Sequence, residues 1–293
     1  MLAVHLQSGV VTTREIPLLH RPPGFALLRL LVAGICNTDL ELQRGYYAFT
    51  GTPGHEFVAQ VVEADTPHLI GKSVVGEINL ACTVCDWCRK GWGRHCPNRT
   101  VLGIVNQPGV FAEPLAAACE ILDQVSIPPG ETIAVLGDGK LGLLVALVLN
   151  AHGYPVHQFG RHRDKLRIAE AAGVAVECHP GHLPVAAYEW VVDATGNPDG
   201  LRAAISMTRP RGTLLMKSTV HGTVGIDTAP MIVNELTLIG SRCGRFEASL
   251  PLLDHHLIRV ESMIAGRFPL CDAPRAFARA AERGVLKVLL QAA

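Results

Sequence analysis

The chain has 293 residues, of which 48% are hydrophobic and 18% charged, and its 26 basic residues balance its 26 acidic ones. This length is enough for two domains with cores of their own, and the composition is typical of a soluble globular protein. The zero net charge argues against nucleic acid as a partner.

The sequence also argues against a secreted or membrane protein. Its first residues lack a charged segment followed by an apolar one, so we read no signal peptide. The longest apolar run, LGLLVALVL at 141–149, is too short to span a bilayer. We therefore expect a cytoplasmic protein with no membrane partner.

Residues 1–118 are rich in Val, Leu, Gly and Pro and contain short apolar runs such as those at 25–35 and 56–64. Runs of this kind, bounded by Gly and Pro, predict a strand-rich domain. Within it, a lobe at residues 80–100 holds four of the nine cysteines.

Residues 119–245 follow a different pattern, in which strands alternate with helices. ETIAVLGDGKLGLLVALVLNAHG (131–153) predicts a buried strand, a glycine-rich turn and a helix. Further strand and helix patterns follow, and their alternation predicts an α/β domain with a doubly wound parallel sheet. Residues 246–293 contain two helix patterns and a closing strand, which we expect to return to the first domain.

The glycine-rich turn has the form G-x-G-x-x-G, with Gly137, Gly139, Lys140, Leu141 and Gly142 as its candidate contacts to a nucleotide. The first glycine permits the tight turn, the second lets the backbone approach a pyrophosphate, and the third lets helix and strand pack closely. The helix N-terminus favours the anion. Because a strand precedes the turn and a helix follows, we predict a dinucleotide site rather than an empty turn.

The end of the next strand bears on the choice of dinucleotide. Proteins that bind NAD usually place an acid there, but this chain has Gly160, with Arg161 and Lys165 following. A carboxylate would repel a 2′-phosphate, whereas glycine leaves room and arginine offers charged donors. We therefore expect NADP(H) in preference to NAD(H). The alternative is that Arg161 and Arg163 are solvated loop charges.

The lobe contains Cys82, Cys85, Cys88 and Cys96 within fifteen residues. Four thiolates at this spacing can close a tetrahedral Zn²⁺ site with no open position, which is typical of a structural zinc. The alternatives are an iron–sulfur cluster, disulfides or thiols without a ligand, and the spacing differs from that of ferredoxins.

A second candidate metal site combines Cys36, His55 and Glu56, which offer one sulfur, one nitrogen and one oxygen ligand. A mixed, incomplete set is what a catalytic zinc requires, because one position must stay open for substrate. Asp39 could hold the imidazole by its second nitrogen, and Thr38 could pass a proton. Each residue alone is more often a core or surface residue; together they predict a catalytic site.

Six motifs occur in one order along the chain: GICNTD (34–39), GHE (54–56), the four-cysteine lobe (82–96), FAEPLA (111–116), VLGDGKLG (135–142) and VVDATG (191–196). With them the chain resembles the zinc-dependent medium-chain alcohol dehydrogenase family. The resemblance implies a GroES-like catalytic domain split around a Rossmann domain. It also implies hydride exchange between a nicotinamide and a small-molecule alcohol or carbonyl, in a homodimer or homotetramer.

The resemblance implies roles for single residues. Cys36 and His55 match the ligands of the catalytic zinc, and Glu56 matches an acid that can be a ligand or exchange with water. Thr38 matches the hydroxyl that relays the substrate proton. Glu113 matches the position where polyol, sugar and threonine dehydrogenases place a carboxylate near the zinc, which favours a polyol, sugar or hydroxy-amino-acid substrate.

Two features depart from the family pattern. Glu41 stands where a relay histidine is often found, and the segment GIVNQPGVFAEPLAAACEIL (103–122) joins the lobe to the EPLA motif by a shorter path than usual. We expect a zinc-dependent oxidoreductase that exchanges hydride between NADP(H) and an alcohol, polyol, sugar or the corresponding carbonyl. The alternatives are a carbonyl reductase that mainly consumes NADPH, and a non-catalytic relative that keeps the structural zinc and nucleotide fold as a scaffold.

Overall fold

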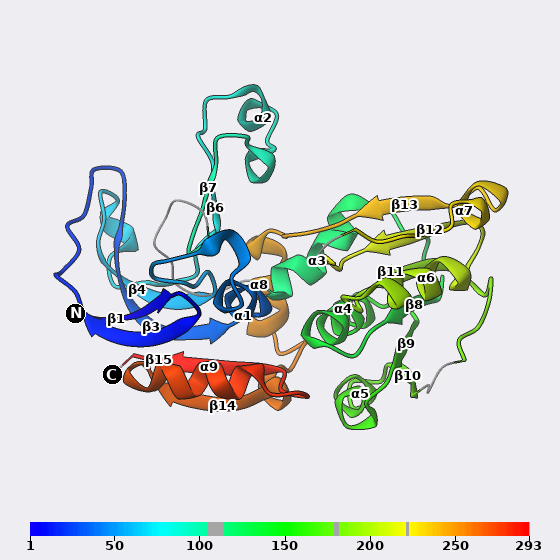
Figure 1. Ribbon diagram of the computed structural model, residues 1–293. Coiled ribbons are helices and arrows are strands. Elements are labelled where there is room, and N and C mark those ends of the chain that lie inside the picture. Colours follow the sequence, from blue (N-terminus) through cyan, green and yellow to red (C-terminus); the bar gives the residue numbers. More distant parts are fainter. Residues whose placement is uncertain (105–113, 179–181, 221–222, 293) are drawn as a thin grey trace. The chain divides into compact units, whose positions relative to one another are not determined.

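The computed structural model describes residues 1–104, 114–178, 182–220 and 223–292 (Figure 1). The chain divides into two compact units, one formed by residues 1–113 and 263–293 and the other by residues 114–262. The boundaries predicted from the sequence were 118/119 and 245/246. Helices α3 (Pro114–Gln124) and α8 (Phe246–Asp254) pack against each other within the second unit.

A fully parallel, six-stranded sheet forms the centre of the second unit. All four residues of β8 are buried, as expected for a central strand covered on both faces. In chain order the strands lie 3-2-1-4-5-6 across the sheet, which confirms the predicted doubly wound Rossmann topology. Across the sheet the order is β10 (Ala175–Cys178), β9 (Val156–Gly160), β8 (Ile133–Leu136), β11 (Tyr188–Asp193), β12 (Thr208–Met216) and β13 (Thr237–Gly240).

Helices cover this sheet. Helix α4 (Lys140–Ala151) is buried on all sides from Gly142 to Leu149, because it lies between the sheet and the neighbouring helices α3 and α5. Helix α6 packs on β11 and β12. None of the helices in the described ranges is long and apolar enough to cross a membrane. The remaining helices of this unit are α5 (Arg163–Glu170), α6 (Pro198–Met207) and α7 (Ala229–Val233).

The first unit is rich in strands, as predicted. Its five-stranded sheet joins the two ends of the chain, since β15 pairs with β3 so that Val288 lies opposite Ile35. Helix α9 (Ala273–Ala281) packs Phe277 into the same core. The sheet order is β14 (Ile264–Pro269), β15 (Lys287–Gln291), β3 (Leu27–Ile35), β4 (Phe57–Glu63) and β5 (Ser73–Val74).

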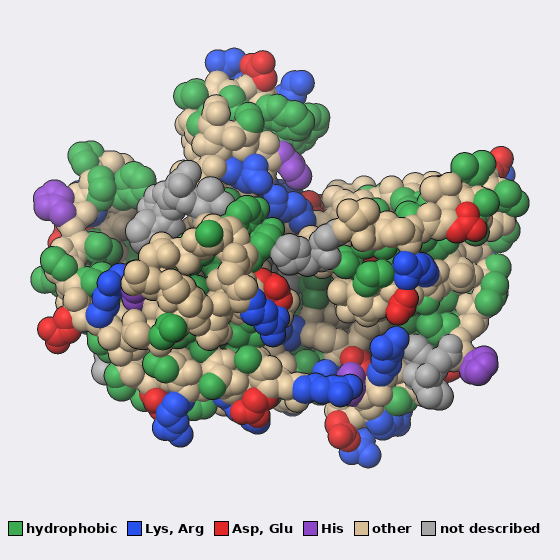
Figure 2. All heavy atoms as spheres, in the orientation of Figure 1, with side chains coloured by type: hydrophobic (Ala, Val, Ile, Leu, Met, Phe, Trp, Pro, Cys, Tyr) green, Lys and Arg blue, Asp and Glu red, His purple; other side chains and the backbone are tan. Residues whose placement is uncertain are grey.

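Smaller elements complete the first unit. The hairpin of β1 (Leu2–Gln7) and β2 (Val10–Glu15) contributes Val4, Leu6 and Val11 to the core. The lobe begins and ends at a two-stranded antiparallel ladder of β6 (Asn79–Leu80) and β7 (Thr100–Val101), and it contains helix α2 (Asp86–Arg89). On the face drawn in Figure 2, acidic and basic side chains are interspersed on each unit. Short 3-10 turns lie at Tyr46–Ala48, Pro67–Leu69, Gly93–His95, Glu261–Met263 and Leu270–Asp272.

Candidate functional site

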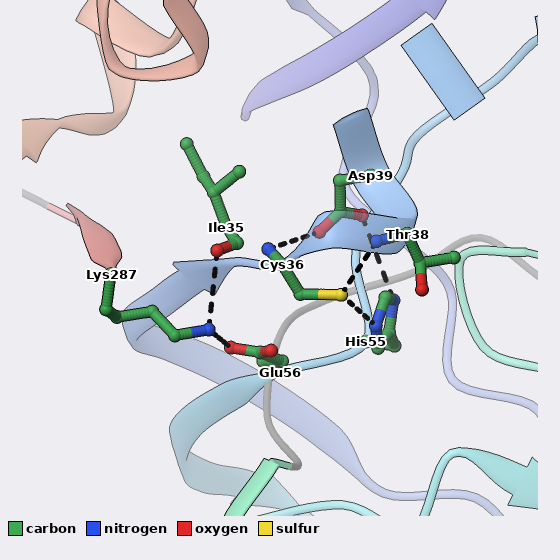
Figure 3. A network of polar contacts seen from close by, with 7 residues as sticks. All are labelled: Ile35, Cys36, Thr38, Asp39, His55, Glu56 and Lys287. Carbon is green, nitrogen blue, oxygen red and sulfur yellow. Dashed lines mark hydrogen bonds and ion pairs between the residues drawn. The ribbon is translucent and has the colours of Figure 1, made fainter. Parts of the chain in front are cut away.

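Cys36 lies at the N-terminus of helix α1 (Asn37–Gln43), directly after strand β3 (Figure 3). Its sulfur accepts a hydrogen bond from the Thr38 amide at 3.2 Å, and its own amide donates to Asp39 Oδ2 at 2.9 Å. These two bonds form a capping box, which satisfies amides that the first turn of a helix leaves without partners. The helix start therefore fixes both the thiol and the carboxylate.

His55 reaches the same place because β3 and β4 are antiparallel, so the end of one strand lies beside the start of the other. The Gly34 amide donates to the Glu56 carbonyl at 3.1 Å. Gly54 has a φ of +112°, a conformation that favours glycine, and a Cβ on Gly103 would overlap the Gly54 backbone. As a result, the His55 Nε2 atom lies 2.9 Å from Cys36 Sγ.

The second ring nitrogen of His55, Nδ1, lies near the Asp39 carboxyl. Asp39 Oδ1 and His55 Nδ1 are buried 3.8 Å apart, and neither has a hydrogen-bond partner among the described residues. Burial of the Asp39 carboxyl, with the charge of the Cys36 thiolate beside it, raises its pKa to about 8. Buried polar atoms without partners beside a thiol and an imidazole fit a site that takes up a cation.

The donor set fits a metal ion. The ligand atoms of Cys36, Asp39 and His55 all lie within 4.8 Å of one another. A tetrahedral Zn²⁺ with one sulfur and one nitrogen ligand separates these two atoms by about 3.6 Å. The Cys36 and His55 side chains would therefore move slightly apart to admit the ion. Asp39 would accept a hydrogen bond from His55 Nδ1.

Glu56 is not part of this cluster. Its buried carboxylate forms an ion pair with Lys287 of β15, which also donates to the Ile35 carbonyl at 3.3 Å (Figure 3). Gly34 leaves room for the pair, because a Cβ there would lie 2.5 Å from Glu56 Oε2. Glu113, the other candidate for a third ligand, lies outside the described residues.

The four lobe cysteines converge, as their spacing suggested. Sγ distances are 3.5 Å for Cys85–Cys88, 3.7 Å for Cys85–Cys96 and 4.0 Å for Cys82–Cys88. The edge of a ZnS₄ tetrahedron is about 3.8 Å, given a zinc–sulfur bond of about 2.3 Å. None of the four is in a disulfide. The donor set therefore fits a closed, structural Zn²⁺ site.

The lobe thiols differ in acidity. The amides of Val84 and Cys85 lower the pKa of Cys82 to about 6, while loss of solvation and the neighbouring thiols raise the pKa of Cys88 to about 12. The raised pKa of Cys88 follows in part from crowding, since four sulfurs cannot all be charged at this distance without a cation. A bound metal would remove that conflict.

The glycine-rich turn joins β8 to α4 in the second unit. Gly137 has a φ of +125°, and a Cβ there would lie 2.6 Å from the Ala194 carbonyl oxygen. A Cβ on Gly142 would overlap the Gly137 carbonyl, whereas one on Gly139 would meet nothing within 4 Å. Gly139 is the N-cap of α4 and supplies no side-chain cap. The turn thus leaves free space at uncapped helix amides, which fits a pyrophosphate.

A cavity of about 300 Å³ adjoins the turn at the carboxyl ends of β8, β9 and β11. Of the predicted nucleotide contacts, Gly137, Gly139, Gly160, Arg161 and Lys165 line it. The first residues of α4, including Lys140 and Leu141, follow directly on the turn. The position fits the rule that parallel sheets bind ligands at the switch in strand order, here between β8 and β11.

Asp138, between the first two glycines, is a further residue of this site that was not predicted from the sequence. Its carboxylate reaches the end of β9 and accepts from the amides of Arg161 and His162, each at 2.6 Å, and contacts His162 Nδ1 at 3.0 Å. A Cβ on Gly160 would lie 2.6 Å from Asp138 Cβ. The pairing of an acid inside the turn with a glycine at the strand end is the signal that could have revealed it.

Comparison with protein families gives two matches in chain order. The family described as alcohol dehydrogenase GroES-like domain matches residues 22–126, and the family described as zinc-binding dehydrogenase matches residues 141–255. The first match includes both candidate zinc sites, and the second includes the strand end at Gly160.

Curated relatives match over most of the chain. The D-altritol 5-dehydrogenase of Agrobacterium fabrum is 26% identical over 308 residues, covering 91% of this chain and 92% of the relative. The sorbitol dehydrogenase of Halalkalibacterium halodurans is 25% identical over 313 residues, covering 90% of each chain.

Solved structures agree in fold. An alcohol dehydrogenase from Thermus sp. ATN1 superposes with a TM-score of 0.89 at 26% identity, covering 100% of both chains. A protein of Sinorhizobium meliloti described as a zinc-binding dehydrogenase, solved with NADP, superposes with a TM-score of 0.86 at 26% identity, covering 99% of this chain and 98% of that one.

Proposed function

Since this chain belongs to the zinc-dependent medium-chain alcohol dehydrogenase family, and so is an alcohol dehydrogenase-like oxidoreductase, we propose that it exchanges hydride between NADP(H) and a polyol or sugar alcohol. The observation that carries the proposal is the contact between Cys36 and the buried His55, with the orphaned atoms of Asp39 and His55 beside it. A structural zinc is closed by four protein ligands, so an incomplete ligand set such as this one is typical of a catalytic zinc.

We assign the catalytic zinc to Cys36 and His55, with Glu56 or Glu113 as third ligand, and the structural zinc to Cys82, Cys85, Cys88 and Cys96. When bound, the catalytic zinc supplies positive charge that lowers the pKa of an alcohol and polarises a carbonyl. Glu56 lies outside the cluster of ligand atoms, with its Oε2 paired to Lys287, so its side chain would have to move to become a ligand.

The surrounding residues hold the site and move the proton. Asp39 Oδ1 lies 3.8 Å from His55 Nδ1. With a metal bound at Nε2, Asp39 would accept a hydrogen bond from the Nδ1 side of the ring and so orient the imidazole. Thr38, half-buried on the first turn of α1, carries the hydroxyl to which we assign proton transfer with the substrate. Lys287 neutralises the buried Glu56 carboxylate.

The preference for NADP(H) rests on the charges at the end of β9. Arg163 pairs with Glu170 and Arg167 pairs with Asp164, at 2.6 Å and 3.4 Å. Arg161 is exposed and lines the cavity, and no bond from its guanidinium to another described residue is found. An unpaired fork of donors suits a 2′-phosphate.

The substrate class rests on the relatives. The names of the relatives include dehydrogenases of altritol, arabitol phosphate and sorbitol, all of which are polyols or their phosphates. Glu113 in the EPLA motif is the acid that agrees with this class. We also propose a homodimer or homotetramer in the cytoplasm, formed through residues 235–244, which include the edge strand β13.

The deciding experiment is elemental analysis of zinc per chain, with titration of NADPH and NADH on the same sample and a screen of polyols, sugars and aldehydes. Two zincs, tight NADPH binding and turnover of a polyol are the expected results. One zinc without turnover would instead favour the non-catalytic scaffold, and turnover confined to carbonyl substrates would favour a reductase.

A further inference from the structure

We propose that Asp138 is a specificity-determining residue for the nucleotide. Its carboxylate fills the space beside Gly160, so that no acid can stand at the end of β9, and it holds the β9–α5 turn so that Arg161 faces the cavity. The inference rests on the proposed NADP(H)-dependent function, because it explains how the chain sets that preference.

The first support is that the Asp138 carboxylate makes several hydrogen bonds to the turn that follows β9. Both Asp138 oxygens are used: Oδ2 accepts from the amides of Arg161 and His162 at 2.6 Å, and His162 Nδ1 lies 3.1 Å from Oδ1 and 3.0 Å from Oδ2. Only 10% of the Asp138 side chain is exposed. Asp138 also lines the cavity, and its negative charge there is met by backbone amides and the His162 imidazole.

The second support is the reason for glycine at position 160. Gly160 lies in strand β9, and its φ is outside the left-handed range in which a side chain would be strained. The glycine is needed for space instead: a Cβ there would lie 2.6 Å from Asp138 Cβ and 2.7 Å from its Oδ2. Asp138 and Gly160 thus depend on each other, although 22 positions separate them.

The third support is what the bonds do to the turn. Arg161 and His162 lie between the last residue of β9 and the first turn of α5, where His162 is the N-cap without a side-chain cap of its own. The two bonds to Asp138 tie these amides to the glycine-rich turn. The tie fixes the backbone that carries Arg161, whose guanidinium has no bonded partner in the described residues, at the wall of the cavity.

It follows that a single Gly160→Asp substitution, which restores the acid typical of NAD binders, fails in this chain. The new carboxylate collides with Asp138 and adds a like charge beside it. Removing Asp138 first opens the space, so the acid at 160 becomes acceptable only in the Asp138→Ala background.

The test is a cycle of four proteins: wild type, Asp138→Ala, Gly160→Asp and the double variant. The melting temperature is measured without nucleotide, and dissociation constants for NADPH and NADH are measured by fluorescence titration. Asp164→Ala is the control, because Asp164 is an exposed acid on α5.

We expect Gly160→Asp to lower the melting temperature by about 4 °C or more and the double variant to regain most of that loss relative to Asp138→Ala. Asp138→Ala should weaken NADPH by about tenfold and NADH much less. The double variant should bind NADH more tightly than NADPH, while Asp164→Ala leaves both constants unchanged.

Additive changes in melting temperature would overturn the dependence between Asp138 and Gly160. A larger loss for NADH than for NADPH in Asp138→Ala would also overturn the proposal, since Asp138 would then itself be the ribose acid. If wild type prefers NADH, the proposed cofactor preference fails, and the melting cycle without nucleotide still decides the dependence.

Discussion

Cys36 has two tasks at once: its sulfur caps the first turn of α1, and the same sulfur lies 2.9 Å from His55 Nε2. A cap is normally a Ser, Thr, Asp or Asn side chain. Here the capping geometry aims a thiol at an imidazole, so the local fold of residues 36–39 is also the first half of a metal site.

Substituting either ligand should abolish catalysis without unfolding the chain. We expect Cys36→Ser and His55→Ala each to lower turnover roughly a thousandfold or more and to reduce bound zinc from two to one per chain. Elemental analysis and NADPH kinetics check this, with the exposed Cys178→Ser as control. Full activity in either variant would rule out the site.

Asp39 should make the metal-free protein sensitive to pH. Its pKa is raised from 3.8 to about 8 by burial, so between these values the folded chain holds a proton that the unfolded chain has lost. The free energy of unfolding should therefore fall as pH rises from about 4 to 8, by at most about 1.4 kcal/mol per pH unit.

Denaturant unfolding of chelator-treated protein at several pH values measures this slope. In Asp39→Asn the slope should flatten, while the exposed Asp164→Asn should keep it. Equal slopes in wild type and Asp39→Asn would show that this carboxyl does not titrate as described.

Lys287 should matter for stability far more than an ordinary lysine. Its side chain is 13% exposed and its partner Glu56 is 7% exposed, so Lys287→Met leaves a buried carboxylate without a counter-charge. We expect a loss of about 3–5 kcal/mol in the free energy of unfolding, partly recovered in Glu56→Gln/Lys287→Met. The exposed Lys72→Met is the matched control, and a similar small effect for both lysines would contradict the ion pair.

At the scale of elements, the glycines of the glycine-rich turn have different roles, in ligand binding or in packing. A methyl group on Gly139 meets nothing within 4 Å, whereas one on Gly142 overlaps the Gly137 carbonyl. We expect Gly139→Ala to keep its melting temperature but to weaken NADPH about tenfold or more, because the methyl occupies the space of the pyrophosphate. Gly142→Ala should lower the melting temperature itself. Unchanged NADPH affinity in Gly139→Ala would place the nucleotide elsewhere.

The lobe is an element without a core. Cys96 is the only buried residue between positions 82 and 96, and Trp87 and Trp92 are about half exposed. We expect a strong chelator to release its zinc and open it to trypsin at Arg89 and Lys90 while the second unit stays folded. Mass spectrometry of the early fragments checks this. Cleavage equally fast before and after chelation would show that metal does not hold the lobe.

At the scale of the whole molecule, features set by neighbouring residues were predictable from the sequence. The G-x-G-x-x-G turn and the alternating strands gave the correct sheet, and the cysteine spacing predicted a cluster that the structure brings together. The same holds for Cys36 and His55, although their roles as ligands stay a prediction.

Contacts between distant residues were not predictable. Glu56 pairs with Lys287 across 231 positions. Asp138 meets Gly160 through packing between two segments, so its sequence signal is visible only when the turn and the strand end are considered together. The shortened path before the EPLA motif also stays a prediction. The alignment with the altritol dehydrogenase runs over 308 residues and this chain has 293, so that relative holds residues without a counterpart here.

The return of the C-terminal strand has a consequence for how the chain is made. One edge of strand β3 is hydrogen-bonded to β15 in the finished sheet. The contact between Lys287 and Ile35 on these two strands joins residues 252 positions apart. A ribosome must therefore release the whole of 114–262, a continuous compact unit, before that edge is paired. At about 5–20 residues per second the wait is on the order of ten seconds. During it, every nascent chain carries an open strand edge next to Cys36, at which newly made chains can pair wrongly with one another.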